Sequence, residues 1–140
     1  MKKISEKLYV GPQMRADDFG RARDKGITAI INNRPDGEEA GQPSAAENTR
    51  AASAAGLGYT HIPVVSGQIE EAHVRAFQKA VAAAPGAVFA HCRSGTRSAA
   101  LHAIGEVLDG RLSKADVIPL GQTIGIDLSG AVRWLDARGY

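Results

Sequence analysis

Short apolar runs alternate with amphipathic stretches along the chain. Runs rich in β-branched and aromatic residues predict four strands, at 8–10, 27–32, 59–65 and 87–90. Between them, apolar residues spaced three or four apart predict helices over 16–25, 44–55 and 69–84, and each ends at a glycine or a Pro-Gly pair. In the last of these helices, Val74, Phe77 and Val81 form one buried face.

The chain is predicted to be helical after residue 92. An apolar stripe between 100 and 108 marks one helix, Ser113 can cap a short second one, and a last helix can start at Asp127 or Ser129 and end at Arg138. Strands that alternate with helices indicate an α/β fold, with a short, mostly parallel central sheet flanked by helices. Its crevice should lie at the carboxyl ends of the strands, at the loops after Ile31 and Phe89.

Composition limits the classes of protein that the chain can represent. Its 140 residues and 14.7 kDa predict one domain that spans 1–140, with 44% hydrophobic and 23% charged residues. A formal net charge of +2 is too small to predict nucleic-acid binding. No apolar leader follows the first lysines, and the stretch 80–90 is too short for the roughly 20 residues of a membrane span. We therefore expect a cytoplasmic location and no membrane partner.

The chain has a single cysteine, Cys92, which excludes an internal disulfide and a cysteine-rich zinc site. His61, His73 and His102 lack the spacing of metal ligands, so we predict neither a metal nor a cofactor. Cys92 is then either a packed thiol or a nucleophile.

The setting of Cys92 favours a nucleophile. The loop 90–98 connects a buried strand to a helix, so its backbone N–H groups and the helix dipole form a cradle for an anion. Gly95 permits the backbone conformation that such a loop requires, and Arg97 can close over the anion with its fork of donors. The same field stabilises the thiolate of Cys92, and Ser98 can donate a hydrogen bond to it.

Other residues of the two crevice loops complete the predicted site. We assign Arg93, Ser94 and Thr96 to anion binding, and His91 to a structural role beside the loop. Arg34, after the strand 27–32, can either help to bind the anion or form a surface ion pair with Asp36 or Glu38.

The sequence of this loop resembles a known signature. The pattern His91-Cys92-x-x-Gly95-x-Arg97-Ser98 is similar to that of cysteine-dependent phosphatases and rhodaneses. Four further blocks, at 8–13, 30–38, 59–64 and 125–128, resemble the phosphatase-like domain of bacterial β-lactamase hydrolase-like proteins. The resemblance implies a dual-specificity-phosphatase-like fold.

Two departures from the phosphatase pattern bear on function. Tyrosine and dual-specificity phosphatases place five residues between the nucleophile and its arginine, whereas four lie between Cys92 and Arg97, as in many rhodaneses. Phosphatases of this fold also carry an aspartate after the strand matched by 59–65, where this chain has no carboxylate. Asp36 is our predicted substitute for this general acid. The other carboxylates that could replace it are Glu38, Glu39, Glu70 and Glu71.

These departures make a sulfurtransferase our main hypothesis. Cys92 would take sulfur from thiosulfate or a persulfide as a Cys92 persulfide, a reaction whose sulfite leaving group needs no acid. The acceptor must be an external thiol, because the chain has no second cysteine. The resemblance also implies a sulfur dioxygenase as a possible separate partner.

Two other hypotheses remain open. The first is a phosphatase that acts on phosphotyrosine or a small phosphate ester through a Cys92 phosphothiol intermediate. The second is a catalytically weak module that only binds an oxyanion.

Overall fold

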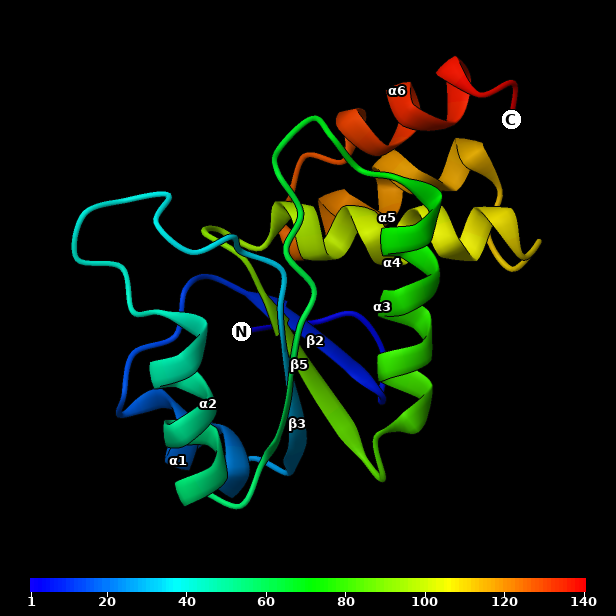
Figure 1. Ribbon diagram of the computed structural model, residues 1–140. Helices are drawn as coiled ribbons and strands as arrows, with labels where there is room; N and C mark the ends of the chain where they lie inside the picture. Colours follow the sequence, from blue (N-terminus) through cyan, green and yellow to red (C-terminus); the bar gives the residue numbers. More distant parts are fainter.

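A five-stranded sheet forms the centre of the computed structural model, which describes residues 1–140 (Figure 1). Its strands lie in the order β1-β2-β5-β3-β4. Their bounds are Lys2–Lys3 (β1), Leu8–Gly11 (β2), Ile27–Asn32 (β3), Gly58–His61 (β4) and Ala87–His91 (β5). Strand β1 is antiparallel to β2, and the other pairs are parallel, which confirms the predicted α/β fold with a mostly parallel sheet.

Helices cover both faces of the sheet (Figure 1). On one face lie α1 (Asp18–Asp24) and α2 (Ala45–Ala54). The other face carries α3 (Glu71–Ala83), α4 (Thr96–Leu108), α5 (Val117–Ile124) and α6 (Ser129–Ala137), with a short 3-10 helix η1 (Lys114–Asp116) before α5. No helix is long and apolar enough to cross a membrane.

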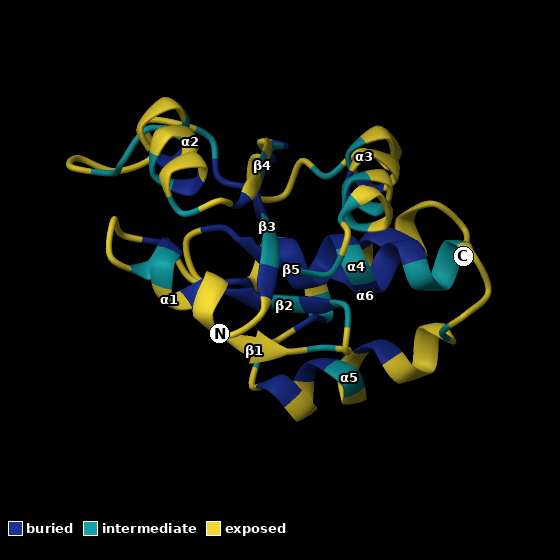
Figure 2. Ribbon diagram, turned by 90° about the horizontal axis from the view of Figure 1, so that it is seen from below, coloured by how far each residue is buried: buried dark blue, intermediate teal, exposed yellow.

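Two apolar cores lie on the two sides of the sheet, whose central strands are buried in Figure 2. Alternate side chains of a strand point to opposite faces, so Ile30 packs against α1 and α2 while Ile31 packs against the larger helical layer. In the same way, Phe89 belongs to the smaller core, and Val88 and Ala90 belong to the larger one.

The observed elements differ from the predicted ones mainly at their ends. Strand β4 stops at His61, four residues before the predicted end, and Pro63, which has no N–H to donate, follows closely. The chain still runs beside β3, since Val64 N donates to Asn33 O at 3.0 Å. The two-residue strand β1 was not predicted, because two exposed lysines carry no apolar pattern.

The parallel pairing of β3 and β5 brings the two crevice loops together. Asn32 and His91, the last residues of these strands, are register partners. Just beyond them, Asn33 N donates to His91 O at 2.8 Å. The loop after β3 therefore lies directly beside the loop that carries Cys92.

Candidate active site

Cys92 follows β5 directly and lies at the start of the turn into α4. Its side chain is buried, with 1% exposed, and Gly95 N donates to Sγ at 3.1 Å. Gly95 has a φ of +105°, and a Cβ there would lie 3.3 Å from Gly11 Cα. Both facts favour glycine at this position of the loop. The first N–H groups of α4 have no partner within the helix and can receive an anion above the sulfur.

Arg97 is held in place by Glu38 and the backbone. Its Nη1 donates to Glu38 Oε2 at 2.7 Å and to Val64 O at 2.9 Å, while Nη2 donates to Glu38 Oε1 at 2.9 Å. The hydrogen bond with Glu38 raises the pKa of Arg97, and the same bond lowers the pKa of Glu38, which Arg34 lowers further. Glu38 accepts hydrogen bonds from Nη1 and Nη2. The side of the guanidinium that carries Nε therefore remains available for an anion.

Ser98 does not donate to the sulfur, contrary to our prediction. Its hydroxyl is buried and donates to Asn33 Oδ1 at 2.8 Å. Asn33 in turn donates from Nδ2 to Ile62 O at 3.0 Å, which turns its amide oxygen toward Ser98. A buried carbonyl oxygen needs a donor, and Ser98 supplies it. Ser98 therefore fastens α4 to the neighbouring loop.

His91, which we predicted to have a structural role, lies directly before Cys92 at the end of β5. It is fully buried, and its Nδ1 lies 3.3 Å from Cys92 O, while Nε2 has no partner. Burial lowers the pKa of His91 to about 4, so its ring is neutral at physiological pH. It therefore supports the loop without adding positive charge to it.

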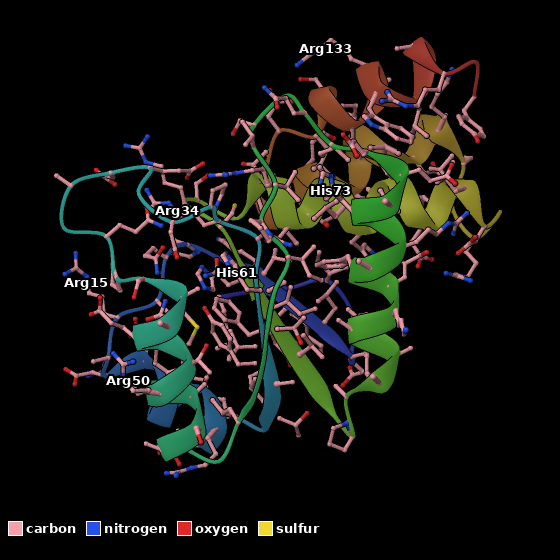
Figure 3. The ribbon with its side chains drawn as sticks, in the orientation of Figure 1. Arg15, Arg34, Arg50, His61, His73 and Arg133 are labelled. Atoms are coloured by element: carbon pink, nitrogen blue, oxygen red, sulfur yellow. The ribbon has the colours of Figure 1, made fainter.

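Arg34 lies beneath the loop and not in the crevice. Its guanidinium is buried and donates to Glu38 at 3.0 Å, Glu39 at 3.1 Å and Gln13 at 3.1 Å. Figure 3 shows it close to His61, whose Nε2 lies 2.8 Å from Arg34 O. Of the two roles that the sequence left open for Arg34, the structure shows the ion pair. The guanidinium is buried and not at the surface, and its partners are Glu38 and Glu39.

The predicted substitutes for a general acid are used elsewhere. Asp36 Oδ1 accepts a hydrogen bond from Ala45 N at 2.8 Å, at the start of α2. Glu70 forms a capping box with His73 at the start of α3, where Glu71 occupies the first turn. Asp36, Glu70 and Glu71 are therefore tied to helix starts, and our assignment of Asp36 to the catalytic site is not supported by its position.

One cavity of about 520 Å³ opens above Cys92. Three segments line it: the Cys92 loop with Arg93, Ser94, Thr96 and Arg97, the loop 66–69, and the stretch 127–138 that includes α6. Arg93, Ser94 and Thr96, which we assigned to anion binding, are exposed at the cavity, whereas the sulfur is buried. No group of three or more His, Cys, Asp and Glu side chains is arranged to hold a metal ion.

Asp127 is a site residue that our sequence reasoning missed. It is the one carboxylate that lines the cavity, and it comes from the turn between α5 and α6. Its Oδ1 accepts a hydrogen bond from Ser129 N at 2.9 Å, and this bond, more than the nearby Arg133, lowers the pKa of Asp127. The only signal in the sequence was its place in a block that resembles the family.

A parallel sheet delivers Cys92 to an arginine-bearing loop at the start of α4, an arrangement that fits a cysteine-dependent, phosphatase-like protein. The family model described as "Beta-lactamase hydrolase-like protein, phosphatase-like domain" matches residues 1–109. The chain belongs to this family, as the sequence resemblance predicted.

Curated relatives agree with this assignment. The chain is 47% identical to a β-lactamase hydrolase-like protein of Agrobacterium fabrum over 136 residues, 97% of this chain and 32% of the relative. It is 44% identical to one of Xylella fastidiosa over 135 residues, 96% of this chain and 31% of the relative. The chain thus spans about a third of the length of these relatives.

Solved structures of phosphatases share the fold. A putative phosphatase of Neisseria meningitidis is 33% identical, with a TM-score of 0.88 over 97% of this chain and 96% of that chain. A putative phosphatase of Shewanella putrefaciens is 18% identical, with a TM-score of 0.75 over 98% and 91%. TpbA of P. aeruginosa, solved with phosphotyrosine, is 18% identical, with a TM-score of 0.71 over 96% and 83%. The two less similar structures show the fold alone.

These findings contradict our sulfurtransferase prediction and favour the phosphatase alternative. The matching family model is that of a phosphatase-like domain, and the 33% identical structure is a putative phosphatase. The four-residue spacing does not by itself distinguish a sulfurtransferase from a phosphatase. With Gly95 in a left-handed conformation, the shorter loop still places Cys92 and Arg97 in one cavity. The comparisons therefore support an enzyme of the phosphatase-like class.

Proposed function

We propose that this chain hydrolyses phosphate monoesters through a covalent intermediate on Cys92. The observation that carries the proposal is the position of Cys92 Sγ at the base of the cavity, under the N-terminus of α4 and beside Arg97. Loop N–H groups and the guanidinium of Arg97 are suited to the negative charge on the three outer oxygens of a phosphoryl group.

The reaction has two displacements at phosphorus. The thiolate of Cys92 attacks the phosphorus, an S–P bond forms, and the ester P–O bond breaks with its electron pair on the leaving oxygen. Water then attacks the phosphothiol, its proton passes to a base, and inorganic phosphate leaves as the thiolate is restored. Asp127, the carboxylate that lines the cavity, supplies the base for this second step.

The low pKa of Asp127 restricts the leaving group. An ionised carboxylate has no proton to give to a departing alkoxide, which is a strong base. A phenoxide is a weaker base and leaves with less help. Aryl phosphates, phosphotyrosine among them, therefore fit this site better than alkyl phosphates.

The test is turnover of p-nitrophenyl phosphate between pH 5 and 8 by the purified chain and by the Cys92→Ser variant. We expect turnover by the native chain and none by the variant, because a serine hydroxyl is a much poorer nucleophile than a thiolate. Acid quenching during turnover, followed by mass spectrometry, should find one phosphoryl group on the peptide that contains Cys92.

Two results would contradict the proposal. Equal turnover by the native and Cys92→Ser chains would move the reaction away from Cys92. No turnover across the pH range, with inorganic phosphate still bound in calorimetry, would leave a module that binds the anion without reacting.

A further inference from the structure

The cavity above Cys92 carries more positive charge than the phosphoryl site uses. Four arginines and one aspartate line it. Two of these arginines already have carboxylate partners, since Arg97 pairs with Glu38 at 2.7 Å and Arg93 lies 3.8 Å from Glu39. The other two, Arg133 and Arg138, have no acidic side chain within ion-pair distance. Asp127 lies near Arg133 but forms no ion pair with it, so a net positive charge remains along α6 and at Arg138.

Neutral groups hold both of these arginines at the cavity. Arg138 stacks on the Trp134 ring, 3.9 Å from its centroid, and donates to Trp134 O at 3.3 Å. Arg133 donates to Ser129 Oγ at 3.2 Å (Figure 3). Such contacts orient a guanidinium without neutralising it, so each arginine keeps donors for an incoming anion.

The cavity is also too large and too apolar for a phosphate ion alone. Its volume of about 520 Å³ lies in the range of roughly 300–1,000 Å³ that is typical of sites for whole small molecules. Its apolar lining includes Ala100, Leu128, Ala131 and Trp134. A flat apolar group fits this lining better than a hydrated one.

We propose that the cavity selects aryl phosphates that carry a second anionic group, with the phosphoryl group at Cys92 and the second anion at Arg133 and Arg138. This inference rests on the proposed function and names its substrate class. The aryl ring lies along the apolar lining between the two charged ends. Asp127 repels any second anion placed near the turn before α6, which favours the side of the helix where Arg138 stands.

The experiment compares 4-(carboxymethyl)phenyl phosphate with 4-methylphenyl phosphate. The two esters release phenols of similar acidity, so they differ mainly in the second charge. We expect the carboxymethyl ester to have a kcat/KM about five- to tenfold higher at low ionic strength, the size of one or two exposed charge contacts. The ratio should fall toward one in 1 M NaCl, where the screening length is about 3 Å.

Arginine variants locate the second site. Arg133→Gln and Arg138→Gln should each lower the ratio of the two kcat/KM values about two- to threefold. The matched control is Arg50→Gln, because Arg50 is an exposed arginine on α2, on the other face of the sheet (Figure 3), and it should leave the ratio unchanged. A ratio near one in the native chain, or a ratio that neither cavity variant lowers, would overturn the proposal.

Failure of the second site can be told apart from failure of the phosphatase. If both esters are hydrolysed with equal kcat/KM values, only the proposal of a second anion site is overturned. If neither ester is hydrolysed, the phosphatase proposal fails, and calorimetry on Cys92→Ser then decides the second site. Tighter binding of the carboxymethyl ester supports it, whereas equal or undetectable binding of the two esters overturns it.

Discussion

Asp127 and Cys92 reach one cavity from segments more than thirty residues apart in the sequence. The sulfur lies at its base, and the carboxylate lies at an exposed turn on its rim. Ser129 N keeps that carboxylate ionised, which suits a proton acceptor and not a proton donor. The two residues therefore act in different steps of the proposed reaction. Cys92 attacks phosphorus in the first displacement, and Asp127 accepts a proton from water in the second.

This division predicts the effect of Asp127→Asn. The asparagine keeps an oxygen for Ser129 N but cannot take a proton from water, so hydrolysis of the phosphothiol should slow roughly 100-fold while its formation continues. Rapid mixing with p-nitrophenyl phosphate should show a burst of p-nitrophenol, followed by slow turnover.

The control for this variant is Asp17→Asn, which changes an exposed aspartate before α1 that makes no side-chain cap hydrogen bond. It should behave like the native chain. Unchanged turnover by Asp127→Asn, without a burst, would show that another group or water itself serves the second step.

The sequence is most informative about residues whose partners lie in the same loop. Gly95 and Arg97 could be assigned because their roles depend on the neighbouring Cys92 and on the start of α4. Glu38 and Asp127 could not be assigned with the same certainty, because their partners come from distant segments and an acidic residue in a turn is usually solvated. Ser98 was misassigned for the same reason, since Asn33 lies 65 residues away.

At the scale of elements, the loop between β3 and α2 clamps the loop between β5 and α4. Glu38 accepts hydrogen bonds from both Arg34 and Arg97, so one carboxylate joins a buried guanidinium to the one that faces the cavity. Glu39 adds a weaker link between Arg34 and Arg93. The position of Arg97 thus depends on the loop between β3 and α2, which takes no part in the covalent chemistry.

Glu38→Gln tests this clamp. A neutral amide cannot compensate the positive charges of Arg34 and Arg97, so the free energy of unfolding should fall by roughly 1–3 kcal/mol. The loss should be smaller than for a fully buried ion pair, because the Glu38 side chain is partly exposed. The displaced Arg97 should lower kcat/KM for p-nitrophenyl phosphate about tenfold or more. Urea denaturation and steady-state kinetics measure the two effects.

Glu39→Gln provides the comparison, because the Glu39 side chain is 53% exposed and contacts no group on Arg97. We expect a smaller loss of stability and a change in kcat/KM below about threefold. Equal kinetic effects of the two variants would mean that Glu38 acts through the general charge of the loop and not by positioning Arg97.

Prediction of elements succeeded where local chemistry sets their bounds. Helix α2 begins after Ser44, whose side chain forms a capping box with Glu47, and it ends before Gly56. Strand β3 has the predicted bounds because it is apolar on both faces and lies inside the sheet. The end of β4 was misplaced, since an apolar run does not show where ladder hydrogen bonds stop.

At the scale of the whole molecule, the order of the strands determines which loops meet. Neither sequence distance nor loop composition indicated that β5 lies between β2 and β3. The rule for parallel sheets located the Cys92 loop at the cavity, whereas the loop after β3 lies beside that loop and does not line the cavity. The function was harder to predict, because the spacing within one loop and the resemblance along the whole chain point to different reactions. Glycine conformation and the long-range clamp on Arg97 compensate for the shorter loop.

Stability of the whole fold should depend on pH through His91. Burial lowers its pKa in the folded chain to about 4, whereas an unfolded chain has a pKa near 6.5. Between these values the unfolded chain binds more protons, so stability is complete above about pH 6.5 and is lost as the pH falls toward 4. The loss from this residue approaches roughly 3 kcal/mol, because each pH unit between the two pKa values corresponds to about 1.4 kcal/mol. His102, whose pKa burial also lowers, adds a loss in the same direction.

Urea denaturation at steps from pH 7.5 to 4 measures this dependence, and His91→Asn isolates its source. The asparagine amide can replace Nδ1 in its contact with Cys92 O but does not titrate, so the variant should start less stable and lose less stability on acidification. His102→Gln is the matched control and should keep most of the native slope, because the more deeply buried His91 is still present. If His91→Asn kept the full slope, the pH dependence would have to come from the carboxylates, whose losses should continue below pH 4 because ion pairs lower the pKa of Glu38.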